Sequence, residues 1–569
     1  MSVSSPSIVV FGAGKIGRGF VADLFHAAGY TLVFIDKSET LIERLNKAGR
    51  YTVVRAPGPD DIRRVTIDGY TALHTSQQAE VEGAVVAADL LAISVFPGDF
   101  AAVAQQLAPA VTAKHRAHPD KPFDILLCTN LAHADAQFRE QLGEALEPEV
   151  RDEVMAHTGI VQCLVIRMAV DAPEEMRQGD PLLVYSNGYP YLYVDKQGFR
   201  GQVPQVPGVC PVEDMRAEEA RKLLTYNLFQ AALAYLGARK GYVLSSECIG
   251  DASVLEVAKG ALDESSAALQ SEYGFSPEEM AMWNGNVVAQ TSNPLLGDTV
   301  ARLAGDPRRK LARGDRLVGA ALLARKHGLP TPNLVKAIVA GLLYAAPEDA
   351  GAKAVQQQMA ESGIGGAISE ICGLTEAEGS LARDIAAAYT RMRVEEQWAA
   401  AAQRAYDLGF EYEKMYHGCG QCALAAVLEA LDRFEPSVFN AATPLSAGIG
   451  LCGENATCSA LIGGALAFGL THPRRREHFD GDRESKYRAF EMAQRLRERY
   501  LQHYGTITCH QIHTKLMGRG YDLREAAERE AFEAAGAHTD KCTAVVANAA
   551  KWAVEIIGEM SMAEDEARS

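Results

Sequence analysis

Apolar residues follow two different rhythms along this chain of 569 residues. Over the first 200 residues, short apolar runs alternate with stretches of helical periodicity; the runs include Ile8–Phe11, Thr31–Ile35, Leu90–Val95 and Ile125–Cys128. Short buried runs between amphipathic helices indicate the βαβ units of a parallel sheet. The segment Val184–Val194 predicts an antiparallel addition to this sheet, with a turn at Asn187-Gly188.

From about residue 217 to residue 406 the pattern becomes almost wholly helical, and residues 376–416 predict a helix broken only near Gly379 and Gly409. No linker rich in proline, glycine or serine precedes the C-terminal region. We therefore predict an α/β Rossmann domain at 1–200, an all-α substrate domain at 201–400, and a mainly α, cysteine-rich domain at 401–569. The third domain is expected to pack on the second.

Charge and hydropathy exclude several classes of partner. The formal net charge of −17 argues against binding to nucleic acid or to anionic membranes. The apolar runs are short and interrupted by glycine, and the N-terminus lacks the pattern of a signal peptide, so we expect a cytoplasmic protein without a membrane span. In that reducing compartment clustered cysteines are metal ligands or redox thiols more often than disulfides.

A glycine-rich turn, Gly12-Ala13-Gly14-Lys15-Ile16-Gly17, follows the first predicted strand and precedes a helix. In this context Gly12 permits a tight turn, Gly14 lets the backbone approach a pyrophosphate, and Gly17 allows close packing of helix on strand. The whole turn is predicted to bind a dinucleotide. The alternative is a glycine turn without a ligand.

Asp36 ends the second predicted strand, where a carboxylate suits a ribose 2′-hydroxyl and favours NAD. Lys37 follows directly, so NADP is less favoured but stays open. Val95 and Asn130, at the ends of two further predicted strands, complete the expected nucleotide site.

Lys222, Asn227 and Gln230 share one broad helix face, because at about 100° per residue they span an arc of about 140°. Here the chain resembles the mannitol-1-phosphate dehydrogenase branch of the polyol-specific long-chain dehydrogenases. The resemblance covers residues 7–395 and depends on six ordered motifs: Phe11–Phe20, Lys222–Gly237, Tyr273–Phe275, Asn293-Pro294, Arg309–Leu317 and His327–Pro330.

The resemblance implies a Rossmann domain, a helical C-terminal domain and an active site between them that works without a catalytic metal. It assigns the general base to Lys222 and oxyanion stabilisation to Asn227. Gln230 stands where the family has histidine, and Ile166 and Thr129 also depart from the family's residues.

From these motifs we predict an NAD-dependent oxidoreductase that acts on the CH–OH group of a polyol, sugar acid or sugar phosphate, with Lys222, Asn227 and Gln230 as catalytic residues. One alternative is a redox or metal sensor whose dehydrogenase-like domain binds NAD(H) without turnover. Without the resemblance, the residues alone favour a surface helix lysine at Lys222, the commonest role for a lysine.

Four further residues are predicted to contact the substrate: Gln162, Arg167, Arg309 and Lys310. Gln162 could add an oxyanion donor. Arg309 and Lys310 belong to a local concentration of basic residues that suits an anionic substrate such as a sugar phosphate. The same residues are also consistent with a solvated helix face paired with nearby aspartates.

Six of the eleven cysteines lie in the C-terminal region: Cys419, Cys422, Cys452, Cys458, Cys509 and Cys542. Several begin predicted helices, where backbone amides are expected to lower the pKa of a thiol. Their arrangement resembles the cysteine-motif family named C_GCAxxG_C_C over residues 405–560, although Thr457 and Ser459 flank Cys458 where that family has glycine and alanine.

This second resemblance implies redox activity. We predict that the six cysteines bind an iron–sulfur cluster or zinc, since four thiolates suffice for either. The alternatives are buried cysteines that act as small apolar residues, or an interaction domain. The expected partners are the polyol or sugar-phosphate substrate and an electron-transfer partner; the sequence does not indicate an oligomeric state.

Overall fold

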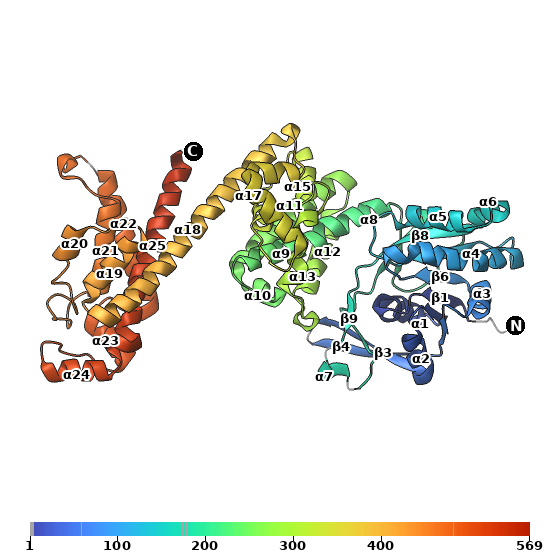
Figure 1. Cartoon of the computed structure of the whole chain (residues 1–569), viewed down its shortest axis with the longest axis horizontal. Coiled ribbons are helices and arrows are strands. Elements are labelled where there is room, and N and C mark those ends of the chain that lie inside the picture. The colour runs from blue at the N-terminus through green and yellow to red at the C-terminus, as the bar shows by residue number, and fades with distance from the viewer. Residues whose placement is uncertain (1–4, 59, 173, 178, 482, 569) are drawn as a thin grey trace. The chain divides into compact units, whose positions relative to one another are not determined.

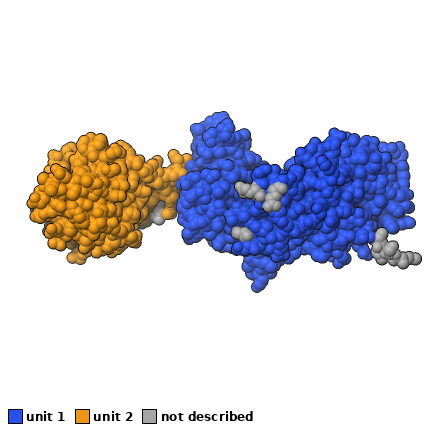
Figure 2. Space-filling view, turned by 90° about the horizontal axis from the view of Figure 1, so that it is seen from below, with its two compact units in different colours: residues 1–388 blue, residues 389–569 orange. Residues whose placement is uncertain are grey.

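The computed structural model describes residues 5–58, 60–172, 174–177, 179–481 and 483–568. The chain divides into two compact units, Met1–Ala388 and Tyr389–Ser569 (Figure 2). The boundary falls within helix α18, Gly379–Tyr416. Among the described helices, none is both long and apolar enough to cross a membrane.

The main sheet of the first unit has the strand order β12-β11-β8-β7-β6-β1-β2-β5. Strands β8, β6 and β1 of this sheet are labelled in Figure 1. Strands β5, β2, β1, β6, β7 and β8 run parallel, and β11 pairs antiparallel with β8. In chain order the parallel strands are arranged 3-2-1-4-5-6, which is the topology of a Rossmann fold. The strands are β1 Ser7–Phe11, β2 Thr31–Asp36, β5 Thr71–His74, β6 Leu90–Ile93, β7 Phe123–Leu127, β8 Thr158–Leu164, β11 Leu192–Asp195 and β12 Val209–Val212.

Along each parallel strand, alternate side chains pack into two separate hydrophobic cores, one on each face of the sheet. Ile8 and Val10 of β1 pack with α1 (Ala22–Ala27) and α2 (Glu39–Ala48). Val9 and Phe11 face the opposite core, which includes residues of α3 Gln78–Ala87, α4 Phe100–Ala117, α5 Ala134–Ala145 and α6 Pro148–His157. Because both faces are covered, the strands are continuous apolar runs. The predicted α/β fold is confirmed, and so are the four predicted strands, which are β1, β2, β6 and β7.

A second sheet has the order β4-β3-β10-β9 and consists of β3 Arg50–Gly58, β4 Asp61–Asp68, β9 Ala169–Asp171 and β10 Val184–Ser186. Strand β10 pairs with β3, whereas β11 pairs with β8, so the predicted segment Val184–Val194 contributes to two sheets. The prediction of an antiparallel addition to the main sheet holds for β11. Strand β10 lies in the second sheet instead, where it pairs antiparallel with β9 and parallel with β3. The turn itself is present, with φ of 66° at Gly188. Asn187 Oδ1 accepts hydrogen bonds from the amides of Met168 and Tyr189, which redirects the chain instead of closing a hairpin.

The helical part of the first unit surrounds α9, Leu228–Ala238, which is buried along most of its length. Helices α11, α13 and α16 pack on it. The predicted helical region is confirmed; its main elements are α8 Met215–Lys222, α10 Ser245–Gly250, α11 Ala252–Tyr273, α12 Pro277–Thr291, α13 Val300–Ala304, α14 Pro307–Lys310, α15 Arg316–Lys326, α16 Pro332–Leu342 and α17 Ala350–Glu370.

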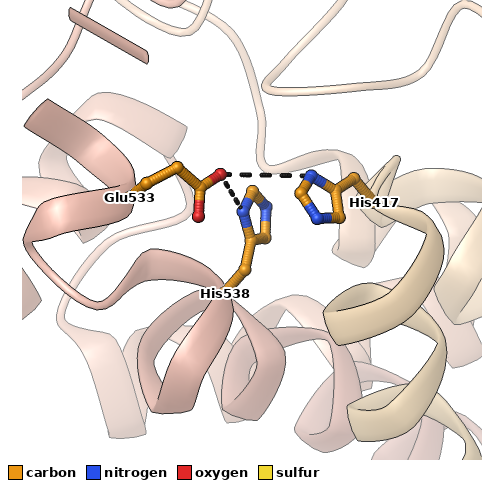
Figure 3. A group of neighbouring side chains, drawn as sticks. All are labelled: His417, Glu533 and His538. Atoms are coloured by element: carbon orange, nitrogen blue, oxygen red, sulfur yellow. Dashed lines mark hydrogen bonds and ion pairs between the residues drawn. The ribbon is translucent and has the colours of Figure 1, made fainter. Parts of the chain in front are cut away.

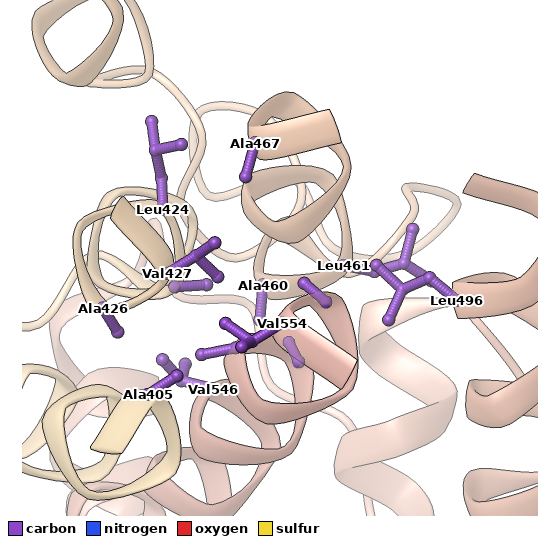
Figure 4. Close-up of a cluster of buried hydrophobic side chains, with 14 of the residues drawn as sticks. Ala405, Leu424, Ala426, Val427, Ala460, Leu461, Ala467, Leu496, Val546 and Val554 are labelled. Carbon is purple, nitrogen blue, oxygen red and sulfur yellow. The ribbon is translucent and has the colours of Figure 1, made fainter. Parts of the chain in front are cut away.

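The second unit is helical, and its core includes Leu424, Val427, Leu496 and Val554 (Figure 4). The break predicted near Gly409 is wrong, because α18 continues through this glycine. A Cβ at Gly409 would lie 3.1 Å from Cα of Ala547, so the glycine permits close helix packing. The main helices after α18 are α19 Cys419–Ala430, α20 Pro436–Ala441, α21 Ser459–Thr471, α22 Arg483–Tyr504, α23 Cys509–Met517, α24 Ala526–Ala534 and α25 Cys542–Arg568.

Candidate functional site

The glycine turn lies at the carboxyl end of β1, beside the carboxyl end of β6. Gly12 has φ of 98°, and a Cβ there would lie 2.7 Å from the carbonyl oxygen of Ser94. A Cβ on Gly17 would lie 2.0 Å from the carbonyl oxygen of Gly12. A Cβ on Gly14, in contrast, meets no atom within 4 Å, so the backbone there faces open space. This geometry fits a pyrophosphate that approaches the turn at Gly14.

Asp36 holds the turn in place. Its Oδ2 accepts a hydrogen bond of 2.8 Å from the amide of Ala13, and its Oδ1 accepts one of 2.8 Å from the amide of Ser38. Lys37 forms an ion pair of 2.9 Å with Asp99. A carboxylate at this position suits a free ribose hydroxyl and repels a 2′-phosphate.

The other predicted nucleotide residues lie around the same turn. Lys15 forms an ion pair of 2.5 Å with Asp171. Ile16 packs against the core that contains α1, and Val95 packs against the opposite core. The carbonyl of Val95 accepts a hydrogen bond of 3.1 Å from the Thr129 hydroxyl, which connects the ends of β6 and β7.

A cavity of about 570 Å³ opens at the carboxyl ends of β7 and β8, within the first unit. The sheet side contributes Asn130 and Gln162 to its lining, and the helical side contributes Lys222 and Asn227. Nζ of Lys222 donates hydrogen bonds of 2.6 Å to Oδ1 of Asn130 and 2.7 Å to the carbonyl oxygen of Val165.

A π-helical turn, Leu223–Asn227, separates α8 from α9 at the predicted catalytic motif. In an α-helix, the side chains of Lys222 and Asn227 would point about 140° apart around the helix axis. Hydrogen bonds in a π turn join residues five apart, so here the two side chains lie closer to the same face of the helix. Both residues line the cavity, whereas Gln230, half-buried on α9, is not among the described residues that line it.

Burial lowers the pKa of Lys222 to about 8. The carboxylate of Glu219 opposes this shift and the guanidinium of Arg316 adds to it. Both acceptors of the lysine hydrogen bonds, the Asn130 amide oxygen and the Val165 carbonyl, are uncharged. The surroundings therefore favour the neutral amine more than water does.

The four predicted substrate residues occupy different surroundings. Gln162 lines the cavity and donates a hydrogen bond of 2.8 Å to Glu219. Arg309 lines the cavity and forms an ion pair of 2.9 Å with Asp306. Lys310 is buried, and its Nζ donates to the carbonyl oxygen of Leu303 at 2.7 Å.

Arg167 is buried outside the described lining of the cavity. Its guanidinium forms an ion pair of 2.5 Å with buried Asp23, donates to the carbonyl oxygen of Tyr189 and lies over the ring of Phe20. These contacts join the π-helical turn Gly17–Val21 and α1 to the segment that follows β8.

Two arginines that were not among the predicted site residues also line the cavity. Arg216 is exposed and lies in α8, and Arg316 begins α15. Arg316 pairs with Asp315 at 2.7 Å, and Arg216 forms no ion pair with another described residue. Arg316 belongs to the basic cluster visible in the sequence; no sequence signal distinguishes Arg216.

In the second unit, a cavity of about 160 Å³ brings together four of the six predicted metal cysteines: Cys419, Cys458, Cys509 and Cys542. Cys422 is buried beside it, where its thiol donates to the carbonyl oxygen of His417 at 3.2 Å. Cys452 is exposed. Neither is among the described residues that line the cavity.

The expectation of lowered thiol pKa values in this cavity is wrong. Burial raises the pKa of Cys419, Cys458, Cys509 and Cys542, and the negative charge of Glu413 raises each of them further. Backbone amides at the start of α21 do lower the pKa of Cys458, but burial outweighs them. Five histidine and glutamate side chains outside the set of six cysteines share the lining: Glu413, His417, His513, Glu533 and His538.

The first unit combines a Rossmann sheet, with an acidic residue at the end of β2, and a helical part that presents a lysine and an asparagine at a shared cavity. These features define a dinucleotide-dependent dehydrogenase. Residues 6–208 match the family described as "Mannitol dehydrogenase Rossmann domain", and residues 214–372 match "Mannitol dehydrogenase C-terminal domain". The mannitol-1-phosphate 5-dehydrogenase of Brevibacillus brevis is 32% identical over 357 residues, which cover 62% of this chain and 90% of that protein. The chain belongs to the mannitol dehydrogenase family of NAD-dependent oxidoreductases.

Two solved structures share this fold. The Pseudomonas fluorescens mannitol 2-dehydrogenase, in a ternary complex with NAD and D-mannitol, has a TM-score of 0.53 and 16% identity over 68% of this chain and 92% of that chain. A D-sorbitol dehydrogenase in substrate-free form has a TM-score of 0.59 and 16% identity over 68% and 93%. Residues 417–556 match the family described as "Putative redox-active protein (C_GCAxxG_C_C)". Both resemblances inferred from the sequence are therefore confirmed.

Proposed function

We propose that the first unit oxidises a secondary hydroxyl of a polyol, sugar acid or sugar phosphate with NAD, and that Lys222 is the general base. The observation that carries this proposal is the pair of hydrogen bonds from Lys222 to Asn130 and to Val165, at the edge of a cavity that opens beside the sheet ends. The glycine turn with Asp36 supports NAD as the nucleotide.

The lysine geometry suits a base. A neutral amine has two N–H bonds and one lone pair, and Asn130 and Val165 provide two acceptors for the N–H bonds. The lone pair then remains for the proton of the substrate hydroxyl. A pKa of about 8 leaves a substantial fraction of neutral amine near neutral pH.

Bound NAD supplies the acceptor for the hydride that leaves the substrate carbon. As the hydroxyl proton passes to Lys222, negative charge develops on the substrate oxygen. The side-chain amide of Asn227 lines the same cavity and makes no hydrogen bond to another described residue, so it can donate to that oxygen. Gln230 can form hydrogen bonds but cannot accept a proton near pH 7, so its catalytic role is confined to orientation.

The substrate class follows from the charge of the cavity. Arg216, Arg309 and Arg316 bring three guanidinium groups to the lining, and forked N–H donors suit a phosphate or carboxylate. The similarity to a mannitol-1-phosphate 5-dehydrogenase supports a phosphate. Gln162 lines the same cavity and donates a hydrogen bond to Glu219, whereas Lys310 and Arg167 donate to backbone carbonyls of the surrounding chain.

For the second unit, we propose that Cys419, Cys458, Cys509 and Cys542 form one redox or metal centre, because they share a single cavity. Four thiolates would complete the ligand set of an iron–sulfur cluster. Zinc needs a closer set than the structure has, because no three of the described cysteine sulfurs lie within 4.8 Å of one another. Cys422 and Cys452 are then not ligands.

NADH formation from a panel of polyols, sugar acids and their phosphates tests the dehydrogenase proposal. Lys222→Ala is expected to lower kcat/KM by about 10²- to 10⁴-fold, the usual contribution of a general base. Lys259→Ala, an exposed lysine of α11, is the matched control and should leave the rate unchanged. Equal activity of wild type and Lys222→Ala would exclude this role, and NADH binding without turnover on the whole panel would favour the sensor alternative.

A further inference from the structure

Three side chains from separate segments of the second unit converge beside the cysteine cavity (Figure 3). His417 follows α18, Glu533 lies in α24, and His538 lies in the short helix Ala537–Lys541. Oε1 of Glu533 lies 2.5 Å from Nδ1 of His538 and 4.0 Å from Nδ1 of His417. One ligand atom from each of the three residues lies within 4.8 Å of the others.

The two histidine rings are stacked, with centroids 3.8 Å apart and an angle of 28° between their planes. Both rings present Nδ1 toward the same carboxylate oxygen, as the dashed lines in Figure 3 show. Two imidazole nitrogens and one carboxylate oxygen therefore point to one small volume. The separations of 2.5 and 4.0 Å lie on either side of the roughly 3.4 Å that separates two ligands of a tetrahedral ion bound at about 2.1 Å.

Glu413 provides an independent observation. Its side chain lines the same cavity and is 2% exposed, and its Oε2 has no hydrogen-bond partner among the described residues. A buried carboxylate is costly unless positive charge lies close to it. Its Oε1 lies 3.6 Å from Nε2 of His538, so His538 has a carboxylate at each ring nitrogen.

This arrangement is the one by which proteins orient a metal-binding histidine. A ligating histidine commonly donates its second ring N–H to a carboxylate, which fixes the tautomer and strengthens the ligand. Oε1 of Glu413 faces Nε2 of His538 at an ion-pair distance of 3.6 Å, on the side of the ring away from Glu533. Nδ1 of His538 and Oε1 of Glu533 share a hydrogen bond of 2.5 Å, so a bound cation would replace the proton between these two atoms.

We propose that His417, Glu533 and His538 bind one divalent cation, with Glu413 as the positioning residue. The ligand set of two imidazoles and one carboxylate selects borderline ions such as Zn²⁺ and Co²⁺ over Mg²⁺ and Ca²⁺, which prefer oxygen. Three protein ligands leave an open coordination position beside the thiols of Cys419, Cys458, Cys509 and Cys542. The site uses none of the six cysteines and is independent of the dehydrogenase activity.

Titration of the full-length protein with Co²⁺ alone, after removal of metal by a chelator, tests the site. Because the four thiols are proposed to form a centre of their own, the titration is run in Cys419→Ser as well as in the wild type. We expect one ion per chain to remain in Cys419→Ser, with the weak d–d absorption of nitrogen and oxygen ligands and without intense thiolate-to-cobalt charge transfer. Glu533→Gln and His538→Ala should each weaken binding at least about tenfold, as expected for loss of a ligand. Glu413→Gln should weaken it about 10- to 100-fold and leave the type of spectrum unchanged.

The matched controls are Glu530→Gln, an exposed residue of the same helix, and His478→Ala, an exposed histidine outside the cavity; both should bind Co²⁺ as the wild type does. Circular dichroism and thermal melting establish that each variant is folded. Equal affinities of Glu533→Gln and Glu530→Gln would overturn the proposal. A charge-transfer band that disappears in Cys419→Ser, together with unaltered affinity in Glu533→Gln, would place the ion on the thiolates instead.

Discussion

Nζ of Lys222 donates a hydrogen bond of 2.6 Å to Oδ1 of Asn130. Asn130 follows β7 of the nucleotide-binding sheet, and Lys222 ends the first helix of the helical part. The contact therefore joins the two parts of the first unit at the cavity where the substrate is proposed to bind. Under the proposed mechanism the site needs both parts, since the sheet orients the base that the helix carries.

The pH dependence of oxidation should report the pKa of Lys222, which is about 8. The neutral amine is the active base and its fraction rises with pH, so kcat/KM should rise through pH 8 and level off above it. Asn130→Asp places a carboxylate beside the amine, which raises its pKa and should shift the rise to higher pH by about one unit or more. Asn440→Asp, an exposed residue of the second unit, is the control. An unshifted profile in Asn130→Asp would show that another group titrates.

Asn227 and Gln230 should differ sharply in their effect on catalysis. Asn227 lines the cavity, whereas Gln230 lies one helical turn further on and is not among the described lining residues. Asn227→Ala should lower kcat by about 10²- to 10³-fold, the usual cost of one oxyanion donor. Gln230→Ala should cost less than about tenfold, which steady-state kinetics on the same substrate can measure. A larger loss of kcat in Gln230→Ala than in Asn227→Ala would place Gln230 at the reacting oxygen.

The nucleotide site could be predicted from the sequence because its information is local. Gly12, Gly14 and Gly17 act through backbone sterics within one turn, and Asp36 reaches that turn from the next strand. The π turn at Leu223–Asn227 could not be predicted, because hydrophobic periodicity assumes α-helical spacing and the insertion is maintained by packing on α11 and α15.

The cavity of the second unit shows where sequence reasoning reaches its limit. Spacing alone did not distinguish the four converging cysteines from Cys422 and Cys452, because that depends on how helices far apart in the chain meet. His417, Glu533 and His538 carry no spacing signature either, since more than a hundred positions separate the first from the other two. Only the folded arrangement reveals the buried carboxylate of Glu413 among them.

Two glycine substitutions should separate folding from nucleotide binding. Gly14→Ala adds a methyl group to open space, so the free energy of unfolding should change by less than about 0.5 kcal/mol while NAD binding weakens about tenfold or more. Gly17→Ala pushes a methyl group against the Gly12 carbonyl oxygen and should cost about 1–3 kcal/mol of stability or more. Thermal melting and NADH fluorescence titration measure the two effects. Unaltered NAD affinity in Gly14→Ala would mean that the pyrophosphate does not approach there.

Replacement of Asp36 should change nucleotide preference. Asp36→Asn keeps one acceptor for the Ala13 amide but removes the charge, so NAD affinity should fall by about 1.5–3 kcal/mol, the range for a hydrogen bond to a charged group. The discrimination against NADP should fall at the same time, because the repulsion of the 2′-phosphate is lost. Paired titrations with NADH and NADPH test both effects, with exposed Asp120→Asn as the control. If the affinities for NADH and NADPH fell by the same factor, Asp36 would act only by holding the glycine turn.

Cys452 should be the first C-terminal cysteine to react with iodoacetamide under native conditions. It is exposed, whereas Cys458 and Cys509 are buried, and burial raises the pKa of both thiols and so suppresses the reactive thiolate. Peptide mass mapping over time should show Cys452 modified before the cavity cysteines. Cys452→Ser should remove the fast phase, and Cys419→Ser should retain it. If Cys419→Ser removed the fast phase instead, a thiol of the four-cysteine cavity would be the accessible thiolate. The prediction that Cys452 reacts first would then be wrong.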